Sequence, residues 1–341
     1  MIDRKRKRRT MKKYSNAKGK STDYTNKKRK HIKMNNSVTN VYSRRFRPMN
    51  CNPIIEDGKV VKNSCLSPDV LVLIKDEFNK YHYKDPIVYK TYEELWHKLK
   101  TRLSHCDKED CWLEQIRDIS LRSKIDKMTF APDQPPSWKK NPTTWLSNHD
   151  IMNVLRQYES KTFQNKHKFI LIDPSPIDFD KMPANYHGAC VTEELCKFQL
   201  SEMLENEKTK IGIIFNTDHH KGDGIHWVSL FIDLEDSFIF YFDSNGDPIK
   251  PEVKKLVDRI IEQSSQLVPQ IHLKFYENYP LEHQKKNTEC GMYSLFFIIT
   301  MLTNRIGKRV FHKYEDKINY FKTESIPDNY VFNHRNRYFN N

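Results

Sequence analysis

The sequence predicts a mixed α and β protein, because strand-like and helix-like apolar patterns alternate in its second half. Four apolar segments rich in β-branched and aromatic residues are typical of strands: FILIDP, IGIIF, HWVSLFIDL and SFIFYFDS. The segment PEVKKLVDRIIEQSSQ has the apolar spacing of a long helix, and a further strand is expected around IHLKFY. A continuous apolar run after Cys290 indicates a buried helix. The fold class is therefore α+β, with a central mixed sheet flanked by helices.

Length and composition exclude several classes of protein. The 341 residues, 37% apolar and 30% charged, suffice for one large domain or two modest ones. The longest apolar stretch, residues 292–302, is far shorter than the ~20 residues of a membrane span. The Lys- and Arg-rich start lacks the apolar core of a secretory signal, so an intracellular location is expected. The seven cysteines, odd in number and irregularly spaced, predict mostly buried thiols and no disulfide framework.

The net charge of +14 is concentrated in residues 1–47, which hold 18 Lys and Arg against 2 Asp. The remainder is nearly neutral, with 40 basic and 42 acidic side chains. Such a segment has too few apolar residues to offset ordering entropy, so a disordered basic tail is expected. It suits nuclear import or nonspecific nucleic-acid binding through counterion release, with a purely solubilising extension as the alternative.

Three further segments follow the tail. Residues 48–130 form a predicted helical accessory segment, because VLVLIKDEFNKY, YEELWHKLKTRL and CWLEQIRDISLRSKI each have helical spacing of apolar residues. Residues 131–142 contain four prolines and are predicted to be a connector. Residues 143–341 form the predicted main domain, which begins with a helix capped by Ser147 or Asn148.

Metal binding is not favoured at any His or Cys cluster. His97, His105, Cys106 and Cys111 do not match a common zinc-site spacing, so core packing is the preferred interpretation. The same applies to CVTEELC, which is read as helical, with its two cysteines as buried small hydrophobes.

The adjacent His219 and His220 lie in a glycine-flanked loop without further clustered ligands. No metal or cofactor is therefore expected. His272 and His283 are alternative bases only if the predicted fold is wrong.

Two neighbouring strands carry the first candidate catalytic residues. His226 begins one strand and Asp243 ends the next, and a short turn between the strands predicts that they run antiparallel. The start of one strand then lies beside the end of the other. This places a carboxylate where it can hold the imidazole in one tautomer.

Cys290 is the candidate nucleophile. It precedes the long apolar helix, and a helix N-terminus stabilises a thiolate. A neighbouring His could take the thiol proton and later give it to a leaving amine. Gln284, six residues before Cys290, could add a side-chain N–H to the Cys290 backbone N–H and stabilise an oxyanion.

The joint pattern resembles a known superfamily. An HW pair, a strand, YFDSNG, and a Gln before a CG at the head of an apolar helix are similar to the proteases that process SUMO and related ubiquitin-like modifiers. They also resemble adenovirus endopeptidase and the polyprotein proteases of large DNA viruses. The matching elements extend from TTWLSNHDI to ECGMYSLFF and include PIDFD and GDGIHWVSLFID.

The resemblance implies a permuted papain-like cysteine protease fold. It implies His226 as general base, Asp243 as its orienting carboxylate, Cys290 as nucleophile and Gln284 as oxyanion donor. It further implies that Trp227 covers this triad, and that Trp145 lines a narrow cleft for glycines before the scissile bond. Two departures are a Glu in place of the Asp that many SUMO proteases have before the Cys, and the DHHKGDG insertion.

Three functions remain open. The favoured one is a cysteine endopeptidase that cleaves after glycine-containing motifs in viral capsid or core precursors, which would place it in the virion. The second is a processing or deconjugating protease for SUMO-like modifiers, which would place it in the nucleus. The third is a non-enzymatic nucleic-acid-associated protein, which the intact candidate residues disfavour. The expected partners are protein substrates, with nonspecific nucleic acid at residues 1–47 and no membrane.

Overall fold

The computed structural model describes the chain except for residues 1–44, 57–58, 60 and 160–166. Most of the predicted basic tail therefore lies outside the described residues. Residues 43–341 group as one compact unit. The last residues of the predicted tail already belong to it, because Phe46 packs on Trp96 with ring centroids 5.6 Å apart and the Arg47 amide donates to the Asp107 carbonyl at 2.7 Å.

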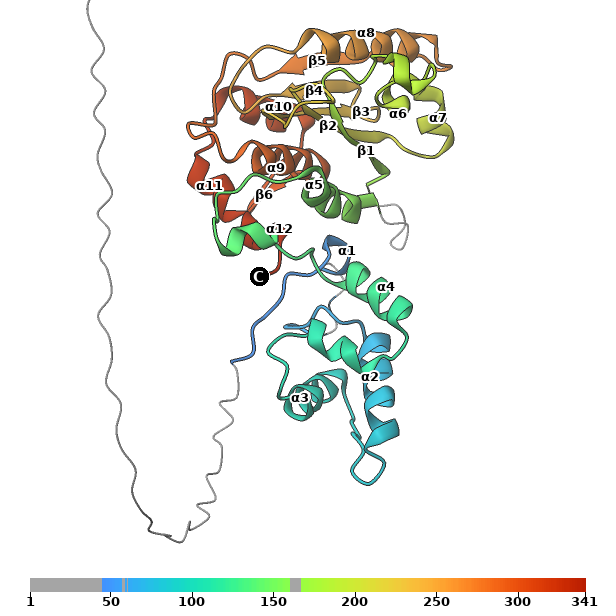
Figure 1. The fold of residues 1–341 in the computed structure, drawn as a ribbon, viewed down its shortest axis with the longest axis vertical. Helices are drawn as coiled ribbons and strands as arrows, with labels where there is room; N and C mark the ends of the chain where they lie inside the picture. Colours follow the sequence, from blue (N-terminus) through green and yellow to red (C-terminus); the bar gives the residue numbers. More distant parts are fainter. Residues whose placement is uncertain (1–44, 57–58, 60, 160–166) are drawn as a thin grey trace, which may run out of the picture. The chain divides into compact units, whose positions relative to one another are not determined.

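A five-stranded mixed sheet forms the centre of the second half, as predicted (Figure 1). Its strands lie in chain order: β1 (Phe169–Pro176), β2 (Lys210–Asn216), β3 (Trp227–Asp233), β4 (Phe238–Phe242) and β5 (Lys274–Glu277). The outer pairs β1–β2 and β4–β5 are parallel, and β2–β3 and β3–β4 are antiparallel. The predicted strands and the antiparallel β3–β4 pairing are thus confirmed.

Every residue of β3 and β4 is buried, because helices cover both faces of the sheet. Val228, Leu230 and Ile232 face one hydrophobic cluster with α8 (Pro251–Gln266), while Phe231 faces the other with α9 (Cys290–Thr303) and α5 (Asn148–Leu155). This two-residue alternation is the strand period. It explains why both strands read as continuous apolar runs.

The helix α9 lies almost entirely inside the protein, with all residues from its first position to Leu302 buried. It packs chiefly on β3 and also contacts α5 and β2. A helix that is apolar on all sides is stable only in such a position, between a sheet and further helices. The first residue of α9 is therefore held in place by the packing of the helix, at one edge of the core.

The remaining elements of the second half are short. They are η3 (Arg156–Glu159), η4 (Ala184–Tyr186), α6 (Glu193–Cys196), α7 (Leu200–Glu205), β6 (Arg305–Ile306), β7 (Arg309–Val310), α10 (Tyr314–Thr323), α11 (Asp328–Asn333) and α12 (Arg335–Tyr338). The predicted N-terminus of α5 is confirmed, since Ser147 and Asp150 form a capping box. None of the described helices combines the length and hydropathy needed to cross a membrane.

The residues before the connector are helical and have their own hydrophobic cluster. Their elements are α1 (Pro53–Glu56), α2 (Pro68–Tyr81), α3 (Tyr92–Arg102), η1 (Asp110–Gln115) and α4 (Ile119–Thr129). The segment CWLEQIRDISLRSKI is not one helix, because Ile116 is extended and Asp118 caps a new helix through the Leu121 amide. The connector contains one short 3₁₀ helix, η2 (Pro136–Lys139).

The prediction that the cysteines are mostly free thiols is wrong. Three disulfides join Cys51 to Cys65, Cys106 to Cys111 and Cys190 to Cys196, and Cys290 alone is free. The reading of CVTEELC as one helix with two cysteine thiols is also wrong, because its first cysteine precedes α6 and its second ends it. Sequence spacing did not reveal these pairs because local folding, and not a regular pattern, brings their Cα atoms to within 6.5 Å of each other.

Truncation of the α9 core should be far more costly than the same change on the surface. Ile298→Ala removes a fully buried side chain and should lower the free energy of unfolding by about 2–5 kcal/mol. Ile119→Ala, at a position 70% exposed, is the matched control and should change it by less than about 1 kcal/mol. Urea unfolding measures both, and equal losses would contradict the assignment of α9 to the core.

Candidate active site

His226 and Asp243 meet at one edge of the sheet. His226 directly precedes β3, and Asp243 directly follows β4, so antiparallel pairing brings the two residues together. The His226 Nε2 lies 2.7 Å from the Asp243 Oδ1, and both residues are buried. Because Nε2 is directed to the carboxylate, the other ring nitrogen, Nδ1, is available to a different group.

Asp243 is held from several sides. Its backbone amide donates to the Asn278 Oδ1 at 2.9 Å, and the Asn278 Nδ2 donates back to the Asp243 carbonyl at 2.7 Å. The Asn245 amide donates to the Asp243 Oδ1 at 2.9 Å. Asn278 was missed by the sequence analysis, although its position just after β5, the parallel neighbour of β4, could have indicated it.

Cys290 is the first residue of α9 and is 2% exposed. Its thiol interacts with the His226 imidazole, since it is one of the groups that raise the pKa of His226. The next residue, Gly291, allows close packing, since a Cβ there would lie 3.1 Å from the Leu146 Cβ and 3.4 Å from the Trp227 Cδ1. The Cys290 thiol, the His226 imidazole and the Asp243 carboxylate thus form one row of interacting groups.

The charged form of His226 is favoured in this row. Burial alone lowers the pKa of an imidazole, but the hydrogen bonds with Asp243 and Cys290 and the charges of these two groups outweigh it and raise the pKa of His226 from 6.5 to about 9. A protonated His226 therefore stabilises the fold below pH 6.5, and this contribution is lost as the pH rises through about 9. At neutral pH the site holds an imidazolium.

Gln284 is joined to the residue after Asp243, Ser244, and is held in one orientation there. Its side chain is buried, and its Oε1 accepts a hydrogen bond from the Ser244 Oγ at 2.9 Å. The backbone amides of Gln284 and His283 both donate to the Ser244 carbonyl, at 2.8 and 2.9 Å. With its oxygen engaged by Ser244, the Gln284 amide keeps its Nε2 donor directed away from Ser244. Such a donor is the group that an oxyanion site requires.

The two predicted cleft tryptophans are both linked to Leu146. Trp227 is buried, and its indole Nε1 donates to the Leu146 carbonyl at 3.1 Å. Trp145 is 40% exposed and directly precedes Leu146 in the chain. Trp227 therefore packs against the start of α9, whereas Trp145 remains accessible to a ligand.

The other histidines considered in the sequence do not join this site. His220 pairs with Asp178, with its Nδ1 2.7 Å from the Asp178 Oδ2, and the His219 Nδ1 lies 3.6 Å from the same oxygen. His272 is exposed. His283 is buried between the Phe321 carbonyl and the Ile326 amide, and burial lowers its pKa to about 4.

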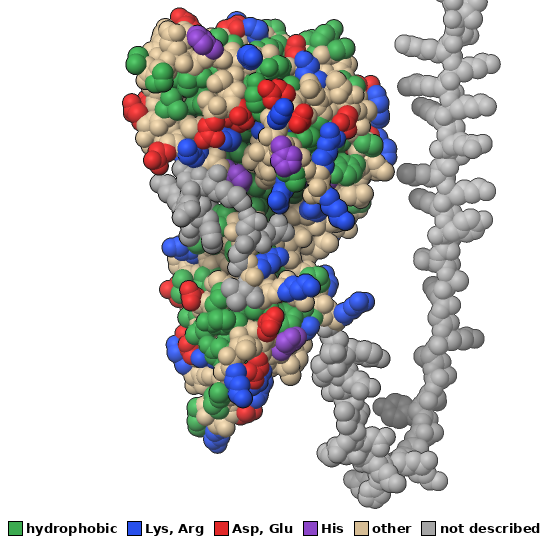
Figure 2. Space-filling model, turned by 180° about the vertical axis from the view of Figure 1, so that it is seen from behind, with side chains coloured by type: hydrophobic (Ala, Val, Ile, Leu, Met, Phe, Trp, Pro, Cys, Tyr) green, Lys and Arg blue, Asp and Glu red, His purple; other side chains and the backbone are tan. Residues whose placement is uncertain are grey.

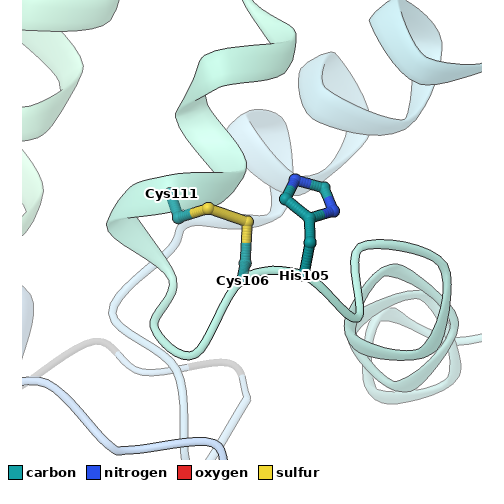
Figure 3. A group of neighbouring side chains, drawn as sticks. All are labelled: His105, Cys106 and Cys111. Atoms are coloured by element: carbon teal, nitrogen blue, oxygen red, sulfur yellow. A yellow bond between two sulfur atoms is a disulfide. The ribbon is translucent and has the colours of Figure 1, made fainter. Parts of the chain in front are cut away.

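One group of possible metal ligands occurs within the part of the chain that the structure describes. Atoms of His105, Cys106 and Cys111 lie within 4.8 Å of one another (Figure 3). The two sulfurs are joined in a disulfide, and a disulfide sulfur is not the thiolate that binds zinc. The predicted core packing is correct for Cys106, which is 4% exposed and packs as half of a disulfide. It is wrong for His97 and His105, which are both exposed.

The arrangement can support acyl transfer. A sulfur nucleophile, an imidazole oriented by a carboxylate, and two N–H donors are the parts of a thiol protease site. These groups come from the start of β3, the end of β4, the loop before α9 and the first turn of α9. Antiparallel strand pairing and the fixed start of α9 bring together residues that are up to 64 positions apart in the chain, from His226 to Cys290.

Comparison with known proteins supports the same chemistry. Residues 199–332 match the model of the Ulp1 protease family, C-terminal catalytic domain. A putative thiol protease of Acanthamoeba polyphaga mimivirus is 27% identical over 276 residues, which cover 74% of this chain and 84% of the relative. A cysteine protease of African swine fever virus is 25% identical over 213 residues, or 58% of this chain and 74% of the relative.

The fold is that of a solved viral protease. The crystal structure of the African swine fever virus protease superimposes with a TM-score of 0.58 at 22% identity, covering 86% of this chain and 97% of that one. The fold and the family match together define the class of protein, which is a thiol protease with an α+β fold of the Ulp1 type. The chain is thus a cysteine protease, and its similarity to the SUMO-protease superfamily and to viral members of it is confirmed.

The pKa of His226 should depend on Asp243. Replacement by Asn removes the negative charge that faces the imidazole, so the pKa of His226 should fall from about 9 toward 6.5. NMR titration of the His226 ring, assigned by its loss in His226→Ala, measures this. Asp247→Asn, at a largely exposed position, is the control and should leave the value unchanged. A titration that Asp243→Asn does not move would contradict the ion pair.

Proposed function

We propose that the chain is a cysteine endopeptidase in which Cys290 is the nucleophile, His226 the general base and acid, and Asp243 the carboxylate that orients His226. Gln284 and the Cys290 backbone N–H are the proposed oxyanion donors. The observation that carries the proposal is the 2.7 Å contact between Asp243 and His226, whose imidazole in turn interacts with Cys290 at the N-terminus of a buried helix. This is the environment in which a thiolate is stable.

The proposed reaction proceeds in two halves. The Cys290 thiolate attacks the scissile carbonyl, and the oxyanion that forms accepts hydrogen bonds from Gln284 and the Cys290 amide. The His226 imidazolium then gives its proton to the leaving amine, the C–N bond breaks, and a thioester remains. Neutral His226 next takes a proton from water, which attacks the thioester and releases the acid, the thiolate and the imidazolium.

Cleavage after glycine-containing motifs is the proposed specificity. Trp227 packs against the first turn of α9, and Trp145 is exposed nearby in the chain segment that Trp227 contacts. Two such rings suit a narrow cleft that accepts residues without side chains. Viral capsid or core precursors are the proposed substrates, and the virion the proposed location, because the similar proteases belong to large DNA viruses. The alternative substrate is a SUMO-like modifier, since one similar viral protein is named a SUMO-1 cysteine protease.

Nonspecific nucleic-acid binding through the basic tail is a separate proposal. It rests on composition, because residues 1–44 contain 16 Lys and Arg against 2 Asp. The described part of the chain offers no comparable concentration of charge on the face in Figure 2, where acidic and basic side chains are interspersed. The tail is thus the proposed site of electrostatic contact with phosphates.

Replacement of Cys290 should separate catalysis from folding. Cys290→Ala should lower kcat by about 10⁴-fold or more, because the nucleophile is lost, with a normal circular dichroism spectrum. The control is Cys106→Ala combined with Cys111→Ala, which removes both partners of one disulfide and should retain activity. Cleavage is followed by mass spectrometry of the products.

Two substrates, incubated side by side, complete this test. One is a polypeptide with an internal Gly-Gly, and the other is a SUMO-like modifier fused to a reporter through its terminal Gly-Gly. Cleavage of the first supports the endopeptidase, whereas cleavage of the second alone supports the deconjugating alternative. Normal turnover by Cys290→Ala, or no cleavage of either substrate by the unmodified chain, would overturn the proposal.

Deletion of residues 1–44 should leave peptide turnover unchanged, because the proposed catalytic residues all lie in the unit formed by residues 43–341. This boundary spares Phe46, which packs on Trp96. The same deletion should remove most of the affinity for double-stranded DNA, and binding by the full chain should weaken steeply with salt. Fluorescence anisotropy in a salt series measures this, and unchanged DNA affinity after the deletion would refute the role of the tail.

A further inference from the structure

A buried ion pair lies directly beside Cys290. Glu289, the preceding residue, is 2% exposed, and Arg335, which begins α12, is 5% exposed. The Arg335 Nη2 donates to the Glu289 Oε2 at 2.8 Å and to its Oε1 at 3.0 Å, and the Nε donates to the Oε2 at 3.2 Å. Three charge-assisted hydrogen bonds in a forked geometry hold this carboxylate in one orientation.

The same guanidinium contacts the connector. It lies over the Trp138 ring at 4.1 Å and the Phe332 ring at 4.7 Å, and its Nη1 donates to the Pro142 carbonyl. Trp138 is anchored in turn, since its indole N–H donates to the Thr144 carbonyl at 2.8 Å. Arg335 therefore joins the residue before Cys290 to the segment that leads into Trp145.

The negative charge of Glu289 would destabilise the Cys290 thiolate if Arg335 did not neutralise it. Glu289 is the N-cap of α9 and directly precedes Cys290, so the carboxylate belongs to the residue next to the sulfur that must carry a negative charge. A like charge so close disfavours a thiolate, and burial strengthens the effect because little water screens it. A paired Arg cancels this charge and leaves the helix N-terminus and His226 to stabilise the sulfur.

The other charged groups near this pair are already engaged. Asp243 faces His226, and Asp328 accepts a hydrogen bond from the Tyr293 hydroxyl at 3.0 Å and from two backbone amides of the loop before α9. His334, next to Arg335, is buried with its Nδ1 on the Tyr330 carbonyl. Among the contacts of the described residues, Arg335 is the cation that meets Glu289.

We propose that Arg335 is a positioning residue for Cys290, which fixes the Glu289 carboxylate, neutralises it, and thereby keeps the Cys290 thiolate reactive at neutral pH. This inference rests on the proposed role of Cys290 as nucleophile. Arg335 does not touch the reacting atoms in this account. It acts through Glu289 and through the backbone that carries the Cys290 amide.

The test measures the reactivity of the sulfur without a substrate. The full chain, unreduced so that its disulfides stay closed, is alkylated with iodoacetamide between pH 5 and 10, and mass spectrometry identifies Cys290 as the modified residue. Arg335→Met should lower the alkylation rate at pH 7 about tenfold and move its pH profile upward. Combining it with Glu289→Gln should restore the rate to within about threefold of the unmodified chain.

Glu289→Gln alone keeps the test decisive if Arg335→Met does not fold. With the carboxylate gone and the cation retained, alkylation between pH 5 and 6 should become faster, and the thermal unfolding curve shows that the variant is folded. Profiles that superimpose for the unmodified chain and every folded variant would overturn the inference. Failure of the proposed function looks different, because Cys290 would then resist alkylation in the unmodified chain or peptide cleavage would persist in Cys290→Ala.

Discussion

The antiparallel pairing of β3 with β4 is the constraint on which the site depends. It turns a separation of seventeen residues into a contact of 2.7 Å, because His226 precedes one strand and Asp243 follows the other. Both strands are buried on both faces, and the alternation of side chains between the α8 and α9 clusters fixes their register. A shift by one residue would turn the apolar side chains away from their clusters and separate the imidazole from the carboxylate.

The polar groups at this edge are stable because each is held by partners contributed from loops and chain segments distant in sequence. Asn278 clamps the Asp243 backbone, Ser244 orients the Gln284 amide, and Arg335 pairs with Glu289. Removing one partner of a buried ion pair leaves an uncompensated charge, which costs about 3–5 kcal/mol. The network therefore contributes rigidity as well as chemistry, and it keeps the reacting groups within the small tolerances that catalysis needs.

Sequence reasoning recovered the sheet and its main helices because their apolar patterns are strong. The β3 and β4 strands, α8 and the start of α9 at Cys290 all lie where the spacing predicts. The same reasoning placed the candidate residues at strand and helix ends, where their meeting follows from topology alone. The residue pattern suggested their catalytic roles and the resemblance implied the same ones; the roles remain proposals.

What the sequence did not reveal depends on tertiary contacts. Asn278 lies 35 positions from Asp243, and Arg335 lies 46 positions from Glu289, so no local pattern connects them. The disulfides were not predicted for a related reason, since irregular cysteine spacing does not indicate which cysteines approach each other. Polar partners supplied across such distances are visible only in the folded chain.

The most direct test of the account is a crystal structure of the chain after reaction with a peptide aldehyde that ends in Gly-Gly. The account predicts a bond from the Cys290 Sγ to the former carbonyl carbon. The hemithioacetal oxygen should lie about 2.7–3.1 Å from both the Gln284 Nε2 and the Cys290 backbone nitrogen, with the His226 Nδ1 beside the sulfur. An adduct on any other residue, or an oxygen that neither donor contacts, would contradict it.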